Sequence, residues 1–236
     1  MTNFIELTAA DGFTFPAYEA RPMGAVKGAI VVLQEIFGVN AHIRAVADGF
    51  AAQGYLALAP STFHRVKPGV ELGYTPDDVA TGVDLKAAVE GLSAPGVLQD
   101  IQATIDYAAK ASAPGGAASI GQVGMVGYCW GGLLTWRAAC LLSGLRAAVP
   151  YYGGGMTQPA EMARTPQCPV LAHFAEQDQS IPLAGVAAFK AAHPEVTLHL
   201  YPATHGFNCD HRGAYDASAA ALARERTLAF FAEHLG

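Results

Sequence analysis

The sequence contains little charge of either sign and no cluster of positive charge. Charged residues make up 14% of its 236 residues, and the net charge is −6. Because nucleic acids and anionic lipids are bound through clustered lysine and arginine, we expect no nucleic-acid partner and no membrane contact. Disordered chains combine high charge with low hydrophobicity, so the 52% of hydrophobic residues favours a folded chain with a large core.

Cysteine is also scarce, and its spacing shows no disulfide or metal-binding pattern. The four cysteines form no Cys-x-x-Cys pair, and no histidine lies at zinc-finger spacing from one. Residues 208–211 read Asn-Cys-Asp-His, but adjacent residues rarely converge on one ion. We therefore expect no metal site and no cofactor, and chemistry from at most one cysteine.

No segment has the character of a signal peptide or a membrane-spanning helix. The first six residues lack a basic start that leads into an apolar stretch. The apolar stretch 133–149 is interrupted by Arg137, Ser143 and Arg146, whereas a spanning helix needs about 20 apolar residues. We expect a cytoplasmic protein.

Short apolar runs alternate with segments of helical spacing along the chain. Two alternating segments, 3–7 and 14–19, flank Asp11-Gly12 and predict a β-hairpin. The predicted buried strands are 28–33, 55–59, 122–126, 147–151, 170–175 and 196–201, and the predicted helices are 40–53, 84–92, 97–110, 131–142, 183–192 and 215–235.

This alternation is typical of an α/β fold with a mostly parallel central sheet and helices on both faces. Residues 61–96 are rich in glycine and proline and predict a loop-rich insertion, and Gly115-Gly116 predicts a turn. No repeat or low-complexity linker divides the chain, so we expect one domain over residues 1–236.

Residues 127–131 read Gly-Tyr-Cys-Trp-Gly and lie between a predicted strand and a predicted helix. In the turn Gly-x-nucleophile-x-Gly, strand and helix pass too close for side chains at the glycines, and the nucleophile is held strained above the sheet. The positive end of the helix favours a thiolate at Cys129. The alternative is a buried, inert cysteine in a glycine-bordered turn.

An acid and a histidine follow Cys129 in the order that such a turn requires. Asp178 comes directly after a predicted strand; its alternative role is to cap the next helix, and Glu176 is a nearby competitor. His205 follows the last predicted strand, and Gly206 lets the loop turn sharply beside it. The three residues predict a Cys-His-Asp catalytic triad.

Six segments together resemble the dienelactone hydrolase family of α/β-hydrolases. They are Gln-Glu-Ile-Phe-Gly-Val-Asn at 34–40, Gly-Tyr-Cys-Trp-Gly-Gly at 127–132, residues 148–153, the Asp178 loop, residues 205–212 and residues 221–227. The resemblance covers nearly the whole chain. It implies the α/β-hydrolase fold and hydrolysis of a small ester or lactone, such as a dienelactone.

The resemblance also implies roles for residues outside the triad. An oxyanion hole would use the backbone N–H groups of Ile36 and Trp130. In family members the acid at the position of Glu35 interacts with the resting thiol and helps to generate the thiolate when substrate binds. The alternative for Glu35 is an ion pair with Arg44 or another helix residue, since buried carboxylates are usually paired.

Substrate contacts are expected from four further residues. The dienelactone-cleaving members hold the substrate carboxylate with two arginines, and Arg212 matches one of them. No arginine lies between residues 66 and 92, so Arg65 is the nearest candidate for the other. Tyr152 and Phe207 lie in matched segments and are expected to contact the substrate.

Two other functions stay open beside hydrolysis of a small ester or lactone. A thioesterase or general carboxylesterase would use the same triad. An inactive α/β-hydrolase that serves as a binding protein has no need for Cys, Asp and His in these three loops. We expect a monomer or a small homo-oligomer that acts on a small molecule.

Overall fold

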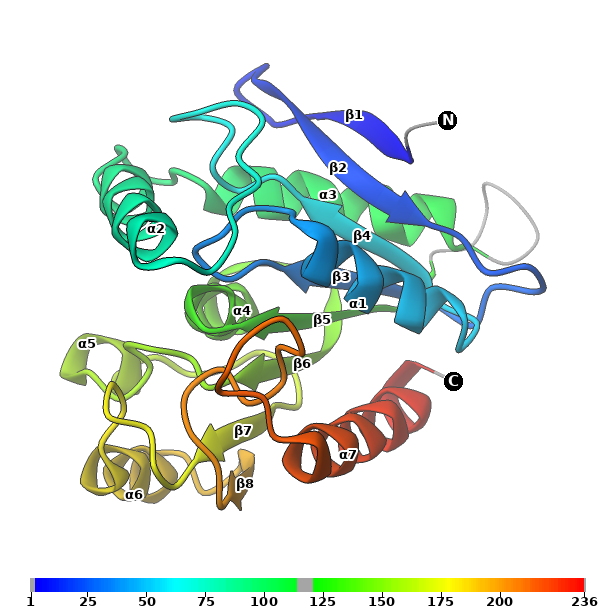
Figure 1. Ribbon diagram of the computed structural model, residues 1–236. Coiled ribbons are helices and arrows are strands. Elements are labelled where there is room, and N and C mark those ends of the chain that lie inside the picture. The colour runs from blue at the N-terminus through cyan, green and yellow to red at the C-terminus, as the bar shows by residue number, and fades with distance from the viewer. Residues whose placement is uncertain (1–2, 114–120, 236) are drawn as a thin grey trace.

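A computed structural model describes residues 3–113 and 121–235, which fold around one eight-stranded sheet (Figure 1). The strands are β1 (Phe4–Thr8), β2 (Thr14–Ala20), β3 (Ala29–Leu33), β4 (Leu56–Pro60), β5 (Val123–Tyr128), β6 (Leu145–Tyr151), β7 (Leu171–Ala175) and β8 (Thr197–Tyr201). Their order across the sheet is β1-β2-β4-β3-β5-β6-β7-β8. β2 pairs antiparallel with β1 and β4, and the pairs from β4 to β8 are parallel. The expected hairpin and mostly parallel sheet are confirmed.

Helices cover both faces of the sheet, as expected (Figure 1). They are α1 (Ala41–Ala51), α2 (Pro76–Glu90), α3 (Leu98–Ala111), α4 (Trp130–Leu141), α5 (Pro159–Met162), α6 (Leu183–Ala192) and α7 (Ala217–Leu235). α1 and α7 share one face, where the rings of Phe50 and Phe231 lie 5.9 Å apart. α3 and α4 share the other, and α6 packs beside α4 through Trp136 and Phe189, whose rings are 5.0 Å apart.

The central strands are apolar throughout because both of their faces are covered. Every residue of β3, β4, β5 and β7 is buried. A strand with one solvated face would alternate apolar and polar residues, whereas a strand buried on both faces does not. The continuous apolar runs in the sequence therefore mark the middle of the sheet.

Helix α2 differs from the expected helix 84–92, since it begins at Pro76 and ends at Glu90. Only Gly82, Leu85 and Val89 are buried along it, so the apolar spacing marks its second half alone. Its start is set by a capping box in which the Thr75 hydroxyl accepts from the backbone N–H of Asp78 and the Asp78 carboxylate accepts from Thr75. The short helix α5 was not expected.

Two expectations concern a glycine turn and membrane-spanning helices. The turn predicted at Gly115-Gly116 lies outside the described residues. Within residues 3–113 and 121–235, no helix combines the length and the apolar character needed to cross a membrane.

The parallel strands place the loops that follow them at one edge of the sheet. Glu35 follows β3, Cys129 follows β5, Asp178 follows β7 and His205 follows β8. Because parallel strands end at the same edge, the fold gathers residues from four distant parts of the sequence. Ligands of open α/β sheets generally bind at this carboxyl edge.

Candidate active site

Cys129 occupies the turn between β5 and α4 with a strained backbone. Its φ of 55° and ψ of −117° lie in a region that residues with a side chain rarely adopt. Its side chain is partly exposed, whereas Cys140 and Cys209 are buried. The expected strained turn is confirmed, and helix α4 begins at the next residue, Trp130.

Glycines are required around Cys129 because backbone segments meet there. A Cβ atom on Gly127 would lie 2.1 Å from the carbonyl oxygen of Gly131. A Cβ atom on Gly131 would lie 2.4 Å from the carbonyl oxygen of Gln34, and one on Gly132 would lie 2.6 Å from that of Tyr151. The expectation that these positions admit no side chain is confirmed. The turn also packs directly on the loop that follows β3.

Asp178 and His205 are joined by a short hydrogen bond. Nδ1 of His205 lies 2.7 Å from Oδ2 of Asp178, whose side chain is fully buried. The other oxygen, Oδ1, accepts from the backbone N–H groups of Ser180 at 2.8 Å and Ile181 at 3.1 Å. Asp178 therefore holds its own turn with one oxygen and His205 with the other. α6 begins after Pro182 without a side-chain cap, so Asp178 is not its N-cap.

The imidazole of His205 is strongly basic in this setting. Burial disfavours the imidazolium, but the hydrogen bond to Asp178 and the interactions with Cys129 outweigh it and raise the pKa of His205 to about 10. The structure thus brings His205 into contact with Asp178, the first of its two predicted partners. A proton on His205 is stabilised by the Asp178 carboxylate.

Glu35 is buried next to this group and is paired with Arg212. The side chain of Glu35 is 1% exposed, and Nη1 of Arg212 donates to its Oε1 at 3.2 Å. Arg44, the alternative partner named from the sequence, pairs with Glu71 at 2.7 Å instead. The partner of Glu35 comes from the loop after β8, not from a helix.

The guanidinium of Arg212 lies beside two aromatic rings and one glycine. Its guanidinium carbon lies 5.5 Å from the ring centre of Phe37 and 5.8 Å from that of Tyr74. A Cβ atom on Gly206 would lie 2.6 Å from Nη1 of Arg212, and the φ of Gly206 is +83°. The predicted sharp turn at Gly206 is confirmed, and this glycine also leaves room for Arg212.

Tyr152 and Phe207 line the interior side of the site. Both are fully buried, and the Tyr152 ring lies 5.1 Å from the His205 ring and 5.2 Å from the Phe207 ring. Tyr152 has a φ of 35°, and its hydroxyl has no hydrogen-bond partner within the described residues. Burial, and next the charge of Glu35, raise the pKa of Tyr152 well above its usual value.

The structure does not bring Arg65 to this group of residues. Its guanidinium donates to both oxygens of Asp100, at 2.8 and 2.6 Å, and to both oxygens of Asp11, at 2.8 and 3.1 Å. Its side chain is 13% exposed. Arg65 thus ties the N-terminal hairpin to α3.

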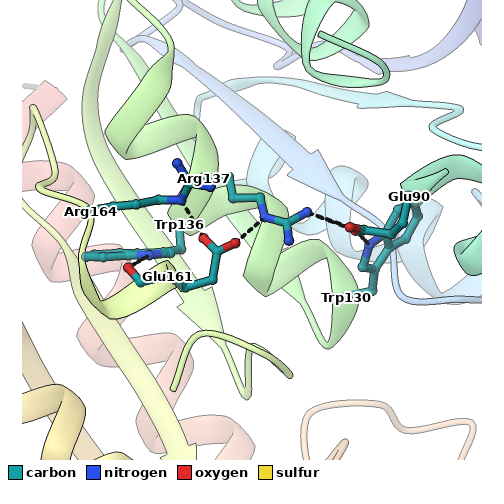
Figure 2. Close-up of polar contacts among 6 residues, drawn as sticks. All are labelled: Glu90, Trp130, Trp136, Arg137, Glu161 and Arg164. Atoms are coloured by element: carbon teal, nitrogen blue, oxygen red, sulfur yellow. Dashed lines mark hydrogen bonds and ion pairs between the residues drawn. The ribbon is translucent and has the colours of Figure 1, made fainter. Parts of the chain in front are cut away.

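A network that sequence reasoning missed holds the side chain of Trp130 (Figure 2). The indole Nε1 of Trp130 donates to Oε1 of Glu90 at 2.7 Å. Arg137 donates to Glu90 at 2.8 Å and to Glu161 at 2.8 Å, and Arg164 donates to Glu161 at 2.7 Å. These residues come from α2, α4 and the α5 region, and no motif links them in the sequence.

The backbone groups of the predicted oxyanion hole lie at the contact between two loops. Trp130 is the first residue of α4, and N–H groups of a first helical turn have no partner inside the helix. Ile36 lies in the loop that Gly131 contacts, and α2 presses on that loop, since a Cβ atom on Gly82 would lie 2.3 Å from the carbonyl oxygen of Ile36.

Glu35 belongs to a second group as well, with His42 and Cys209. One possible ligand atom from each residue lies within 4.8 Å of the others, and all three residues are buried. In the sequence, Cys209 stands beside Asn208, Asp210 and His211, which gave no reason to expect an ion. The convergence of Cys209 with residues after β3 and on α1 was not visible in the sequence.

A family model and several curated proteins match nearly the whole of this chain. The sequence model described as "Dienelactone hydrolase family" matches residues 15–235. A carboxymethylenebutenolidase from Pseudomonas putida is 34% identical over 236 residues, which cover 98% of this chain and 97% of that protein. A Synechocystis protein provisionally named a carboxymethylenebutenolidase is 36% identical over 219 residues, which cover 87% of this chain and 86% of that protein.

A solved structure from Klebsiella pneumoniae, provisionally described as a dienelactone hydrolase, has the same architecture. Its TM-score to this chain is 0.79 at 31% sequence identity. The match covers 98% of this chain and 99% of that one. The likeness therefore extends over the sheet, the helices and the loops at the carboxyl edge.

Proposed function

Because the chain belongs to the dienelactone hydrolase family and is a hydrolase of esters or lactones, we propose that Cys129, His205 and Asp178 form its catalytic triad. The observation that carries the proposal is the 2.7 Å contact between the fully buried Asp178 carboxylate and Nδ1 of His205. This contact leaves Nε2 of His205 as the nitrogen that exchanges a proton with Cys129.

In the proposed first step, the Cys129 sulfur attacks the carbonyl carbon of the substrate while its proton resides on His205. The carbonyl oxygen becomes an oxyanion and accepts hydrogen bonds from the backbone N–H groups of Ile36 and Trp130. The C–O bond then breaks, and the leaving alkoxide takes the proton from His205. A lactone opens in this step, so its alcohol stays attached to the acyl group.

In the second step, water hydrolyses the thioester. His205 takes a proton from the water, whose oxygen attacks the acyl carbon. The carboxylic acid product leaves, and the Cys129 sulfur is released as the thiolate that pairs with protonated His205. The raised pKa of His205 supports the pair formed in this step, because its proton is stabilised by Asp178 on one side and by Cys129 on the other.

Glu35 and Arg212 are proposed to couple substrate binding to activation of the thiol. A substrate carboxylate competes with Glu35 for the guanidinium of Arg212, because both anions accept from the same donors. Release from Arg212 frees the buried Glu35 carboxylate to polarise the thiol of Cys129, whose proton then passes to His205. The 3.2 Å contact between Glu35 and Arg212 supports this exchange.

The proposed substrate is a small ester or lactone, with Arg212 as the single arginine for a substrate carboxylate. Arg65 has no part in this proposal, because Asp11 and Asp100 occupy its guanidinium. This observation keeps a general carboxylesterase or thioesterase as the second candidate. One arginine grips a carboxylate more weakly than two, so neutral substrates are expected to be accepted.

The proposed nucleophile is tested by trapping the acyl-enzyme. After rapid mixing with an activated aryl ester and acid quench, intact-mass measurement should show one acyl group on the wild type. Peptide mapping should place it on Cys129, and Cys129→Ala should carry none and have no turnover. The matched control is Cys168→Ala, since Cys168 is also partly exposed, and it should be acylated like the wild type. Near-normal turnover in Cys129→Ala would rule out the proposed triad.

Other expectations stay predictions. They are the single-domain organisation over residues 1–236, the state of a monomer or small homo-oligomer, and the cytoplasmic location. Contacts of Tyr152 and Phe207 with substrate also stay predictions; both residues are fully buried, so such contacts require the inner wall of the site to open.

A further inference from the structure

Glu35, His42 and Cys209 bring three kinds of metal-ligand atom together beside the proposed active site. A carboxylate oxygen, an imidazole nitrogen and a sulfur lie within 4.8 Å of one another. The three residues are 1%, 3% and 0% exposed. They reach this point from the loop after β3, from α1 and from the loop after β8, so the fold and not the local sequence assembles the group.

The imidazole of His42 is oriented as metal-binding imidazoles are. Its Nδ1 lies 3.0 Å from Oδ1 of Asp210. The other nitrogen, Nε2, is buried and has no hydrogen-bond partner within residues 3–113 and 121–235. A buried nitrogen without a partner is unfavourable, and a metal-bound imidazole generally donates its second N–H to a carboxylate. Asp210 is that carboxylate, and Nε2 is left for an ion.

The thiol of Cys209 has the surroundings of a ligand that exchanges its proton for a cation. Cys209 is 0% exposed, and the possible ligand atoms of Cys209, Glu35 and His42 lie within 4.8 Å of one another. A divalent cation displaces the thiol proton when it binds the sulfur as a thiolate.

The donor set selects a borderline-soft ion. Carboxylate, imidazole and thiolate are the ligands of zinc, with bond lengths of about 2.0–2.3 Å. Those lengths place tetrahedral ligand atoms about 3.3–3.8 Å apart, so small side-chain rotations within the 4.8 Å limit complete the geometry. The charges of Glu35 and of the Cys209 thiolate together neutralise a divalent ion.

Access to the group leads past His42 and Asp210. Both line a surface cavity of about 340 Å³ between α1, α7 and the loop after β8, together with Asn208. The side chain of Asp210 is 62% exposed, so it meets solvent on the outer side of the imidazole. His42 therefore touches the cavity through its contact with Asp210 and reaches the buried group as one of its three members.

We propose that Glu35, His42 and Cys209 form a binding site for Zn²⁺, with a fourth position open to water. This proposal departs from the expectation of no metal, which considered only neighbours in the chain. Nη1 of Arg212 donates to Oε1 of Glu35 and is partly exposed, so an ion at this site takes the place of that contact.

Zinc at this site acts as a reversible inhibitor. The ion binds the Glu35 carboxylate, which then can neither pair with Arg212 nor activate the thiol of Cys129. This consequence, unlike the site itself, rests on the proposed function. Binding is therefore measured without substrate, so that failure of the zinc site and failure of the proposed triad are told apart.

The test is titration of the metal-free, full-length protein with Co²⁺ and Zn²⁺. The wild type should bind one equivalent of Co²⁺ with a thiolate-to-cobalt absorption band in the near ultraviolet, and Zn²⁺ should displace it. Cys209→Ser should lose the band. Asp210 is exposed, so Asp210→Ala should leave the core undisturbed. In competition with a chromophoric chelator, this variant should bind Zn²⁺ about 10-fold more weakly or worse than the wild type.

Two controls separate this site from the nucleophile and from other thiols. Cys129→Ala should keep the cobalt band, and so should Cys140→Ala, whose buried thiol lies on α4. Circular dichroism confirms that each variant is folded. The proposal is overturned if the wild type binds no equivalent of either ion, if the band survives in Cys209→Ser, if it disappears in Cys129→Ala, or if Asp210→Ala binds zinc as tightly as the wild type.

Discussion

The carboxylate of Glu35 accepts a hydrogen bond from Arg212 at 3.2 Å, although 177 positions separate the two residues in the chain. The pair is unequal in its surroundings, because the Glu35 side chain is 1% exposed and that of Arg212 is 23% exposed. Loss of either partner therefore leaves a different charge behind. Substitution of each partner in turn therefore distinguishes the structural role of the pair from its proposed role in activating Cys129.

Removal of Arg212 should destabilise the fold more than neutralisation of Glu35. Arg212→Ala leaves a buried carboxylate without its cation, which should lower the free energy of unfolding by about 1–3 kcal/mol. Glu35→Gln leaves a partly exposed arginine that water can solvate, so stability should fall less while kcat falls strongly. Urea unfolding and steady-state kinetics on both variants measure these effects.

The control for this comparison is Arg44→Ala, which removes the exposed pair between Arg44 and Glu71. Surface pairs contribute about 0–1 kcal/mol, so this variant should unfold much like the wild type. Equal stability losses in Arg212→Ala and Glu35→Gln would contradict the asymmetry. An unchanged kcat in Glu35→Gln would remove Glu35 from the proposed mechanism.

Arg212 should discriminate moderately between acidic and neutral substrates. For a lactone that bears a carboxylate, Arg212→Ala should lower kcat/KM by an amount equivalent to about 1.5–3 kcal/mol, because one charge-assisted contact is lost. The neutral methyl ester should lose little. Arg65→Ala is the matched control and should affect stability rather than acid preference, since Arg65 pairs with Asp11 and Asp100. Equal losses for both substrates would show that Arg212 supports its loop and does not bind the carboxylate.

The stability of the protein should depend on pH through His205. Its pKa is raised from about 6.5 to about 10 in the folded state, so the folded state holds this proton more tightly than the unfolded state. The stability contributed by the proton is fully present below about pH 6.5 and is lost as the pH rises through about 10. The difference in unfolding free energy between the wild type and His205→Gln should therefore shrink by up to about 1 kcal/mol per pH unit across that range.

Cys129→Ala tests the cause of this pH dependence. It removes one of the groups that raise the pKa of His205 and leaves the hydrogen bond to Asp178 in place. The decline in stability should then end at a lower pH than in the wild type. A difference that grows with pH, or a profile that Cys129→Ala leaves unaltered, would contradict the assigned cause.

Glu90 should position Trp130 for catalysis without touching the substrate. Its carboxylate accepts from the Trp130 indole at 2.7 Å and from Arg137 at 2.8 Å (Figure 2). Glu90→Gln weakens both contacts, so kcat should fall several-fold with a smaller change in KM, and stability should fall by about 1–2 kcal/mol. Glu71→Gln makes the same substitution in an exposed pair and should leave kcat, KM and stability unchanged. If Glu90→Gln lowered stability while kcat stayed at the wild-type value, the network would serve folding alone.

Much of the fold could be predicted from local patterns, and the exceptions have physical causes. Buried strands such as β3 are apolar throughout because helices cover both faces of the sheet, so their sequence marks them. Helix α2 was placed too late because few of its side chains are buried, and its apolar spacing marks only the second half. The capping residues Thr75 and Asp78 were the signal for its start.

Each member of the predicted triad sits beside a local sign of its position in the fold. Cys129 lies between glycines that a tight turn requires, and Asp178 and His205 each follow an apolar strand. Partners of charged side chains were not predictable in the same way. Arg44 is close to Glu35 in the chain yet pairs with Glu71. The partner of a charged side chain on a helix is the residue that the fold places beside it, and the sequence distance does not reveal that residue.

The amino-acid sequence alone determined the strands, most of the helices and the strained turn at Cys129. Each of these depends on short-range steric or hydrophobic requirements that leave a local pattern of residues. Contacts between residues far apart in the chain were decided only by the folded structure. The residues around a side chain in the sequence do not indicate which distant partner the folded sheet places beside it. Arg65 is held by Asp11 and Asp100, and Cys209 meets Glu35 and His42 rather than its neighbours in the loop. The parallel strands end at one edge of the sheet, and that geometry alone joins loops that the sequence keeps far apart.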